Sequence, residues 1–361
     1  MTNRVYNFSA GPCTLPQSVL EEVQAELLDF QGQGASLIEV SHRGSLYEPL
    51  HHEARETALR VWNTPDDFDV LFIQGGATGQ FAFVPMNLLN AKNKAAYINS
   101  GHWAKGAIAD AHTVGSVYEA WNGEADNFMR MPRSHEIKLQ DNTRYLHITP
   151  NETISGVRYA EFPDVGVPLV ADMSSEMIAR EIPWQLFDIV YGGAQKNLGP
   201  SGVAVVFIRK SILENTRIDL PRYLRYDIHQ NTQSLFNTPS TFSIWVMGKV
   251  LKWVEQRGGV KAMEHAAIHR SSLIYSNIDS SDGFYTCPAA IENRSTMNVV
   301  FNLPTPELET EFHTQAAKQG MPYLRGHRVL GGIRASIYNS MPTEGVESLV
   351  NFMQAFMQKN G

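Results

Sequence analysis

The sequence predicts an α/β fold with a mostly parallel sheet that helices cover on both faces. Short runs rich in valine and isoleucine alternate with helical patterns across residues 16–210, which is typical of parallel strands joined by helices. Glycine, proline and small polar residues follow most of these runs. The loops after the strands should therefore meet at one edge of the sheet, where open α/β sheets bind ligands.

The composition restricts the kind of protein. The chain has 361 residues, of which 43% are hydrophobic and 19% charged, an ordinary globular composition. The formal net charge of −7 argues against a nucleic-acid surface, which needs a basic face. Two cysteines, Cys13 and Cys287, form neither a disulfide framework nor a metal knuckle, which fits a reducing cytoplasm. We expect no metal site and no membrane span, because no apolar run is long enough to cross a bilayer.

We expect three parts along the chain. An irregular N-terminal arm covers residues 1–15, a large domain covers 16–258, and a smaller α+β domain covers 259–361. The boundary between the two domains is placed at the pair Gly258-Gly259, because these adjacent glycines separate two long helical patterns.

The elements follow from apolar spacing and turn residues. The expected strands are 70–74, 95–99, 145–148, 167–172, 188–191, 203–208, 297–301 and 333–337. The expected helices are 16–32, 49–62, 81–89, one opened by 236–242, 259–278, 306–319 and 343–358. On the first helix, Leu20, Val23, Leu27 and Phe30 form the expected buried stripe.

Lys196 lies in a loop between two apolar strands. An ammonium group is costly to bury, so a lysine held at a strand exit either reaches solvent or acts as a nucleophile toward a carbonyl. Asp172 ends another apolar strand earlier in the chain. A lysine that forms a Schiff base and an aspartate that pairs with a pyridinium nitrogen are the pair that pyridoxal phosphate requires. The carboxylate would keep the ring protonated, so that the ring can stabilise a carbanion at the substrate α-carbon.

A glycine turn follows the expected strand 70–74. Gly75-Gly-Ala-Thr-Gly79 leads directly into a helix, and free backbone N–H groups at such a helix start can hold a phosphate. The alternative is a tight turn without a ligand, because the turn matches neither the dinucleotide pattern nor the P-loop pattern.

Two further strand ends carry candidate cofactor contacts. Trp103 follows the strand 95–99, where its indole could stack on a flat ring or pack in the core. Thr153 follows the strand 145–148, where its hydroxyl could reach a cofactor oxygen or cap the turn. Each residue alone is weak evidence, but together they predict one crevice.

Cationic side chains form two further groups. Arg334 lies in an apolar strand and needs a carboxylate, either an internal one or the α-carboxylate of an amino acid. His327 and Arg328 add donors for a second anion. His42 and Arg43 lie side by side in a loop that is either a solvated turn or part of a site.

Taken together, the chain resembles the phosphoserine aminotransferases, a family of fold-type I pyridoxal-phosphate enzymes. The resemblance runs essentially from end to end. The segments that carry it are Asn7-Phe-Ser-Ala-Gly-Pro12, Glu39-Val-Ser-His-Arg-Gly44, Pro150-Asn-Glu-Thr-Ile-Ser-Gly156, Gly193-Ala-Gln-Lys-Asn-Leu-Gly-Pro200, Phe236-Asn-Thr-Pro239 and Gly331-Gly-Ile-Arg-Ala-Ser-Ile-Tyr-Asn339.

The resemblance implies a seven-stranded sheet, pyridoxal 5′-phosphate as cofactor and a homodimer with shared active sites. It also implies amino transfer from glutamate to 3-phosphohydroxypyruvate in serine biosynthesis, and possible use of a related four-carbon phosphorylated keto acid in vitamin B6 synthesis. By resemblance, Lys196 forms the Schiff base and moves a proton, Asp172 pairs with the ring nitrogen, Trp103 stacks on the ring and Thr153 contacts its phenolic oxygen.

The remaining roles are also implied by resemblance. Ala77, Thr78 and Gln195 would hold the cofactor phosphate, with Asn237 and Thr238 reaching it from the second subunit. Arg334 would bind the α-carboxylate of both substrates. The distal phosphate or γ-carboxylate would be held by four side chains: His42 and Arg43 of the second subunit, His327 and Arg328.

Two positions depart from some members of the family. Thr78 stands where some have arginine, so one contact to the substrate phosphate is missing or supplied otherwise. Ala10 stands where some have serine, which leaves only its backbone for any contact.

The alternatives to this family are an aminotransferase for another small keto acid, a cysteine desulfurase, and a pyridoxal-phosphate-binding dimer that has lost catalysis. The desulfurase needs a mobile cysteine near the cofactor, and neither Cys13 nor Cys287 lies in an obvious flexible loop.

Overall fold

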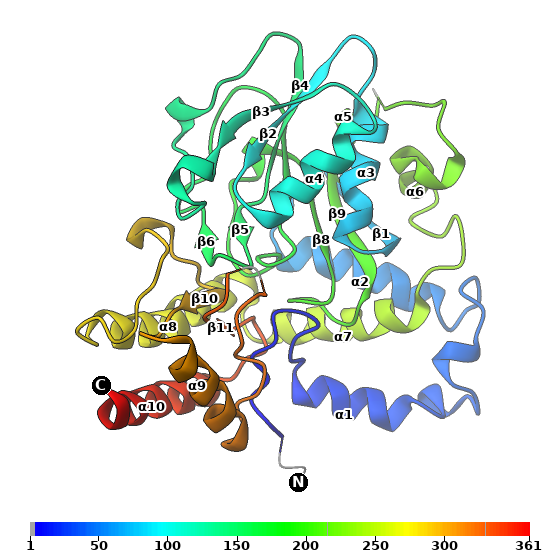
Figure 1. Cartoon of the computed structure of the whole chain (residues 1–361). Coiled ribbons are helices and arrows are strands. Elements are labelled where there is room, and N and C mark those ends of the chain that lie inside the picture. Colours follow the sequence, from blue (N-terminus) through cyan, green and yellow to red (C-terminus); the bar gives the residue numbers. More distant parts are fainter. Residues whose placement is uncertain (1–3, 215, 329) are drawn as a thin grey trace.

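The computed structural model describes residues 4–214, 216–328 and 330–361 (Figure 1). Residues 1–3 of the predicted N-terminal arm therefore lie outside the described residues. The strands are β1 (Phe68–Gly75), β2 (Lys94–Asn99), β3 (Val117–Asn122), β4 (Thr143–Ile148), β5 (Asn151–Glu152), β6 (Val157–Arg158), β7 (Leu169–Asp172), β8 (Phe187–Gly193), β9 (Gly202–Arg209), β10 (Asn298–Phe301) and β11 (Ile333–Ser336).

The α-helices vary widely in length. They are α1 (Gln17–Glu26), α2 (Glu48–Val61), α3 (Ala77–Leu88), α4 (His102–His112), α5 (Lys210–Leu213), α6 (Tyr226–Asn231), α7 (Thr241–Gln256), α8 (Gly259–Asp279), α9 (Pro306–Lys318) and α10 (Thr343–Asn360).

A seven-stranded sheet forms the centre of the molecule, in the order β1-β9-β8-β7-β4-β2-β3. The pairs from β8 to β3 are parallel, whereas β9 pairs antiparallel with both β8 and β1. β1 therefore runs in the same direction as β8, and β9 alone runs against the other strands of this sheet. The prediction of a mostly parallel α/β sheet is confirmed.

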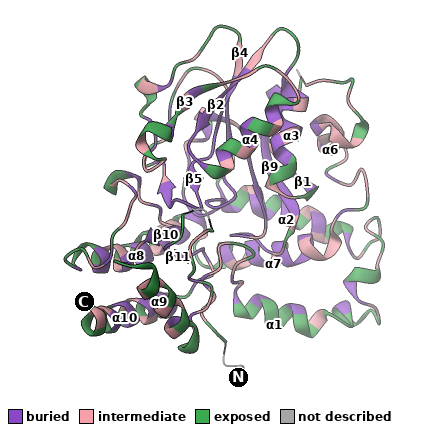
Figure 2. Ribbon diagram, viewed as in Figure 1, coloured by how far each residue is buried: buried purple, intermediate pink, exposed green. Residues whose placement is uncertain are grey.

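Both faces of the sheet are buried by helices. Side chains alternate along β9, so Val203, Val205 and Phe207 pack into one apolar cluster and the residues between them pack into another. The first cluster includes α2 and α7, and the second includes α3 and α4. This is the burial on two faces that parallel sheets require, and Figure 2 shows most of the sheet buried, with β3 at its edge partly exposed.

The structure differs from the elements predicted from the sequence in three respects. No α-helix lies between β4 and β9 in the described chain, so strands and helices do not alternate throughout 16–210. β3 was not predicted, because its six residues are only partly buried and lack an apolar run. The first helix ends at Glu26, and Leu20 and Leu27 are exposed whereas Val19 and Val23 are buried.

A third apolar cluster surrounds the strand pair β10–β11 and joins it to α8, α9 and α10. Thr305 caps α9, because its hydroxyl accepts a hydrogen bond from the Leu308 N–H, and Gly320 follows the helix with φ +78°. The domain boundary at Gly258-Gly259 stays a prediction. Among the described residues, no helix is both long and apolar enough to span a membrane.

The loop between β5 and β6 lies tightly against β10. Gly156 in this loop has φ +69°, and a Cβ atom there would lie 2.7 Å from the carbonyl oxygen of Asn298. Its own carbonyl accepts a hydrogen bond of 2.9 Å from the Ser295 N–H. The loop that carries Thr153 is therefore fixed against the C-terminal part of the chain.

Gly156→Ala should lower the free energy of unfolding by about 3 kcal/mol, because it combines a left-handed backbone with a clash against a strand carbonyl. Gly166→Ala is the matched control, since Gly166 has φ +72° but nothing within 4 Å of the added Cβ. It should cost only about 1 kcal/mol. Urea unfolding at one protein concentration measures both, and equal losses would contradict the proposed contact.

Candidate active site

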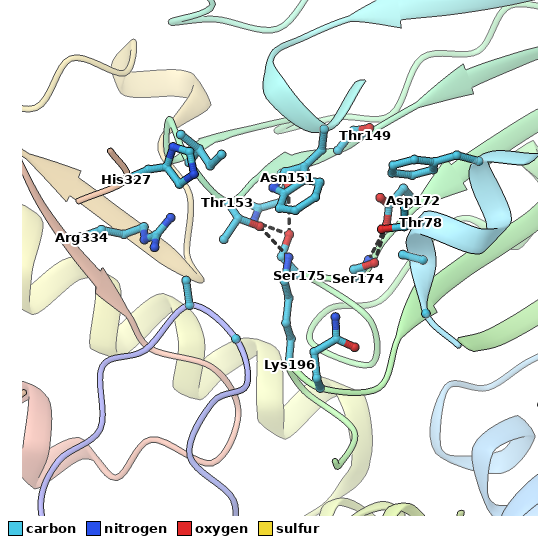
Figure 3. A pocket seen from close by; sticks show the side chains of 18 residues that line it. Thr78, Thr149, Asn151, Thr153, Asp172, Ser174, Ser175, Lys196, His327 and Arg334 are labelled. Carbon is cyan, nitrogen blue, oxygen red and sulfur yellow. Dashed lines mark hydrogen bonds between the residues drawn. The ribbon is translucent and has the colours of Figure 1, made fainter. Parts of the chain in front are cut away.

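A cavity of about 300 Å³ lies at the carboxyl ends of the parallel strands (Figure 3). Its walls come from the N-terminal segment, the loops after β1, β2, β4, β7 and β8, and the strand β11. The lining residues are Ala10, Gly11, Gly76, Ala77, Thr78, Phe81, Trp103, Thr149, Asn151, Thr153, Ile154, Asp172, Ser174, Ser175, Gln195, Lys196, His327 and Arg334. The predicted convergence of strand-end loops on one crevice is thus observed.

Lys196 extends into this cavity from the loop between β8 and β9. Its Nζ donates a 2.7 Å hydrogen bond to Thr153 Oγ1 and lies 5.7 Å from the centroid of the Trp103 ring. Only 8% of the residue is exposed. Burial lowers the pKa of the amine to about 8, although the carboxylates of Asp172 and Glu152 act in the opposite direction. Near neutral pH, part of the population therefore carries a neutral, nucleophilic amine.

Asp172 is the last residue of β7 and also lines the cavity. Its Oδ1 accepts hydrogen bonds from the backbone N–H and the hydroxyl of Ser174, at 3.0 and 2.5 Å. Burial raises the pKa of this carboxyl group, and the two Ser174 bonds and the charge of Lys196 act against the rise. The Ser174 hydroxyl also accepts a hydrogen bond from the Gly193 N–H, which links Asp172 to the end of β8.

Glu152 is a buried carboxylate that the sequence reading missed. It is only 1% exposed and lies at the N-terminus of α4, where it accepts hydrogen bonds from the N–H groups of Trp103 and Ala104 and from the Ser100 hydroxyl. Burial raises its pKa to about 7, although these hydrogen bonds favour the charged form. Glu152 therefore joins the helix that carries Trp103 to the loop that carries Thr153.

The glycine turn after β1 forms an open helix N-terminus on the cavity wall. α3 begins at Ala77, and no side chain caps its first turn. Gly76, Ala77 and Thr78 line the cavity there, and Gln195 lines it from the loop that carries Lys196. Uncapped N–H groups and the helix dipole make this end of the cavity suited to an anion such as phosphate.

Arg334 and His327 line the side of the cavity next to the C-terminal part of the chain. No carboxylate of the described residues lies within 4 Å of the Arg334 guanidinium. Of the two partners that the sequence left open, an internal carboxylate is therefore excluded among the described residues. Burial lowers the pKa of Arg334, and burial together with Arg334 lowers the pKa of His327. The His327 ring lies 5.5 Å from the ring of His102, centroid to centroid.

Five predicted site residues do not line this cavity: His42, Arg43, Asn237, Thr238 and Arg328. Arg43 and Arg328 are exposed, whereas His42 is half-buried, with Nε2 hydrogen-bonded to no described residue. Asn237 donates a 2.8 Å hydrogen bond to Gln74 near the end of β1, and the Gln74 side chain donates to the Thr238 carbonyl. A single chain therefore does not bring these residues into the cavity.

The N-terminal segment contributes Ala10 and Gly11 to the cavity. Only a backbone contact at Ala10 was predicted from the sequence. The Ala10 carbonyl accepts a 2.8 Å hydrogen bond from Tyr338. A Cβ at Gly11, where φ is +146°, would lie 3.5 Å from Lys196 Cγ. The segment thus closes one side of the cavity beside the lysine stem. No group of three or more His, Cys, Asp or Glu side chains in the described ranges could hold a metal ion.

Comparison with known proteins agrees with this architecture. Residues 5–349 match the Aminotransferase class-V family. A phosphoserine aminotransferase from Desulfatibacillum aliphaticivorans is 48% identical, with 100% of both chains covered. The structure of phosphoserine aminotransferase from Bacillus circulans subsp. alkalophilus superimposes with a TM-score of 0.97 at 47% identity, over 100% of both chains. The structure of PLP-bound phosphoserine aminotransferase from Trichomonas vaginalis gives 0.93 at 33% identity, covering 97% of this chain and 100% of the other.

A fold-type I architecture with a buried lysine and an aspartate in one cavity is that of a pyridoxal-phosphate-dependent aminotransferase of class V. Within that class, the chain belongs to the phosphoserine aminotransferase family.

The raised pKa of Glu152 gives a prediction for stability against pH. The folded protein retains this proton up to about pH 7, whereas the unfolded chain releases it near the ordinary pKa of 4.5. The carboxyl group therefore stabilises the fold fully below pH 4.5, and this contribution is lost as the pH rises to 7. In Glu152→Gln the contribution is absent, so the difference in free energy of unfolding, variant minus wild type, should rise by about 3 kcal/mol from pH 4.5 to 8.

Urea unfolding at several pH values measures this difference. The test compares how this difference changes with pH. Any cost of the amide side chain that does not depend on pH therefore cancels. The Glu161→Gln variant, which changes an exposed glutamate outside the cavity, is the control. A flat difference for Glu152→Gln would show that the carboxyl group has the same pKa in both states.

Proposed function

We propose that the protein transfers the amino group between phosphoserine and 2-oxoglutarate, with glutamate and 3-phosphohydroxypyruvate on the other side of the reaction. A related phosphorylated four-carbon keto acid is a second candidate substrate. The observation that carries the proposal is the buried Lys196 amine, 2.7 Å from Thr153, in a cavity that also contains Asp172 and Arg334. Full-length relatives bearing the name phosphoserine aminotransferase support the choice of substrate.

The lining residues fit pyridoxal phosphate. Two buried polar atoms of the lining, Trp103 Nε1 and Thr149 Oγ1, have no hydrogen-bond partner among the described residues. The open N-terminus of α3 offers N–H groups to a phosphate, and Thr78 and Gln195 add side-chain donors there. A Trp103 indole and a carboxylate at Asp172 suit a flat ring with a basic nitrogen.

When bound, the cofactor supplies an aldehyde for the amine and a protonated ring that withdraws electrons from the substrate α-carbon. Lys196 supplies the amine, and its lowered pKa of about 8 makes the neutral form accessible. Once released, its Nζ takes and returns the proton at the substrate Cα as a general base and acid. Thr153 positions this nitrogen through the hydrogen bond it accepts.

Asp172 is suited to hold a proton on the ring nitrogen. Its carboxylate would have to stay charged for this role, although burial raises its pKa. The two hydrogen bonds from Ser174 favour the charged form and fix the orientation of the carboxylate. A cationic ring would strengthen the same preference, because an opposite charge lowers the pKa of a carboxyl group.

Arg334 is the candidate for the α-carboxylate, which both amino-acid substrates share. Its half-buried guanidinium lies on the cavity wall without an internal carboxylate partner among the described residues. An unpaired guanidinium in such a place favours a bidentate carboxylate from a ligand. His327 lies beside Arg334 and is suited to the distal anion, with Arg328 next to it in the chain.

A homodimer with shared active sites accounts for the residues that lie outside the cavity. We assign His42 and Arg43 to the distal phosphate or γ-carboxylate, and Asn237 and Thr238 to the cofactor phosphate, in each case from the second subunit. Exposed apolar side chains on α1 and the segment after it, including Leu28 at 86% exposure, support an interface between subunits. We place the enzyme in the cytoplasm, where two free cysteines remain reduced.

The half-reaction distinguishes an aminotransferase from a cofactor-binding scaffold. The purified holoenzyme, mixed with glutamate and no acceptor, should release about one 2-oxoglutarate per chain, as a covalent amino-transfer mechanism requires. Lys196→Ala should reduce kcat by at least about 1,000-fold, because it removes both the nucleophile and the proton carrier. Circular dichroism should show an unchanged fold, and normal turnover in this variant would end the assignment.

Arg43→Ala tests the shared site. Loss of a charge-assisted contact to a dianion should lower kcat/KM for phosphoserine by roughly 10- to 100-fold, and for alanine by less than about 3-fold. Arg133→Ala removes an exposed arginine outside the cavity and should change neither value. Equal losses for phosphoserine and alanine would contradict a role in phosphate binding.

A further inference from the structure

A second cavity, larger than the first, lies between the N-terminal segment, α1, α7, α8 and the start of α10. Its volume is about 540 Å³. In Figure 1 this is the region where the N-terminal segment passes between α1 and the C-terminal helices. None of the residues that line the catalytic cavity lines this one. The proposed aminotransferase mechanism gives it no role.

The charge of this cavity is opposite to that of the whole protein. Its lining includes three arginines, Arg4, Arg257 and Arg270, and no aspartate or glutamate among its described residues. The chain as a whole has 37 acidic and 30 basic residues, so a cavity lining with only positively charged side chains differs from the overall charge of the molecule. A concave surface of one sign concentrates ions of the opposite sign.

Arg270 of α8 lines the cavity and is only 4% exposed. Its Nη1 donates hydrogen bonds to the carbonyl oxygens of Asn339 and Met341, at 3.3 and 2.5 Å. Its Nε and Nη2 are buried and have no hydrogen-bond partner among the described residues. These two nitrogens form one edge of the planar guanidinium, with parallel N–H bonds that match two oxygens of a phosphate or carboxylate.

An unpaired buried guanidinium is expensive. Burial lowers the pKa of Arg270 to about 10, and no carboxylate of the described chain lies within 4 Å to offset the cost. An anion supplied from solution would restore both the hydrogen bonds and the charge balance.

The other walls add donors of the same kind. Arg4 is held by hydrogen bonds from Nη2 to the Thr14 hydroxyl and the Leu15 carbonyl, at 3.2 and 2.8 Å. Arg257 lies on the rim, with its guanidinium carbon 4.2 Å from the centroid of the Trp253 ring. Both side chains are exposed and form no ion pair with a described residue. They are therefore available to a ligand seated on Arg270.

Two helices also begin at this cavity. α1 starts after Pro16 and α10 after Pro342, and neither has a side-chain cap on its first turn. Pro16, Gln17 and Ser18 of one helix start and Pro342 and Thr343 of the other line the cavity. Uncapped N–H groups and the positive ends of two helix dipoles add to the attraction for an anion.

We propose that this cavity is a binding site for a phosphate-bearing small molecule, with the phosphate held by the side-on fork of Arg270 and by Arg4 and Arg257. A dianion suits three guanidinium groups and two helix starts better than a single carboxylate does. A cavity of about 540 Å³ exceeds the needs of a phosphate ion, so there is room for an attached organic group.

Isothermal titration of the holoenzyme with inorganic phosphate tests the proposal, with glycerol 3-phosphate and succinate as further arms. Arg257→Ala should raise the dissociation constant for phosphate at least about 10-fold and leave aminotransferase turnover unchanged. Arg270→Gln should remove phosphate binding at this cavity, and Arg4→Ala and Arg257→Ala test the same site if Arg270→Gln does not fold. Lys92→Ala removes one exposed positive charge outside the cavity and is the control.

Crystals of the holoenzyme soaked in phosphate locate the ion. The proposal requires phosphate within hydrogen-bond distance of Arg270 Nε and Nη2, and tighter binding of glycerol 3-phosphate than of succinate. It is overturned if phosphate binds equally well to the wild type, Arg4→Ala and Arg257→Ala, or if it is found only in the cavity lined by Lys196. Tighter binding of succinate would overturn the choice of phosphate as the ligand class.

Discussion

The balance of charge around one buried amine determines the arrangement of the catalytic cavity. Burial makes the ammonium form of Lys196 expensive, and the carboxylates of Asp172 and Glu152 partly offset that cost. The result is a pKa of about 8 instead of the 10.5 of an exposed lysine. Each carboxylate is in turn held by hydrogen bonds, Asp172 by Ser174 and Glu152 by the start of α4. The pKa of the Lys196 amine thus depends on residues from three strand ends at once.

Glu152 connects parts of the site that are distant in the sequence. Its backbone belongs to the short strand β5, and its side chain takes the place of a cap at the N-terminus of α4. A carboxylate at a helix start is stabilised by the helix dipole. A shift of either loop would therefore move Trp103 and Thr153 together, and both lie close to the amine of Lys196.

Much of the fold and the main part of the site could be predicted from the sequence. Asp172 ends a strand, Lys196, Trp103 and Thr153 each come after one, and the carboxyl ends of parallel strands meet at one edge. Glu152 could not be predicted, because a glutamate in a turn-rich segment is typical of a solvated loop and only the fold places it beneath α4. The buried stripe predicted for the first helix was wrong at Leu20 and Leu27 but right at Val23 and Phe30. Val19 with Val23 and Leu20 with Leu27 are both acceptable helical stripes. The choice between them depends on the partner surface.

The way in which the N-terminal segment is held has a consequence for biosynthesis. Tyr6 donates a backbone hydrogen bond to Gly320, Phe8 accepts one from Ser336, and Ala10 accepts one from the Tyr338 hydroxyl. Residues 6–10 therefore find these partners only after residues 320–338 have been synthesised. Until then the lysine pocket lacks one wall, so a nascent or C-terminally truncated chain exposes a reactive amine that the finished protein encloses.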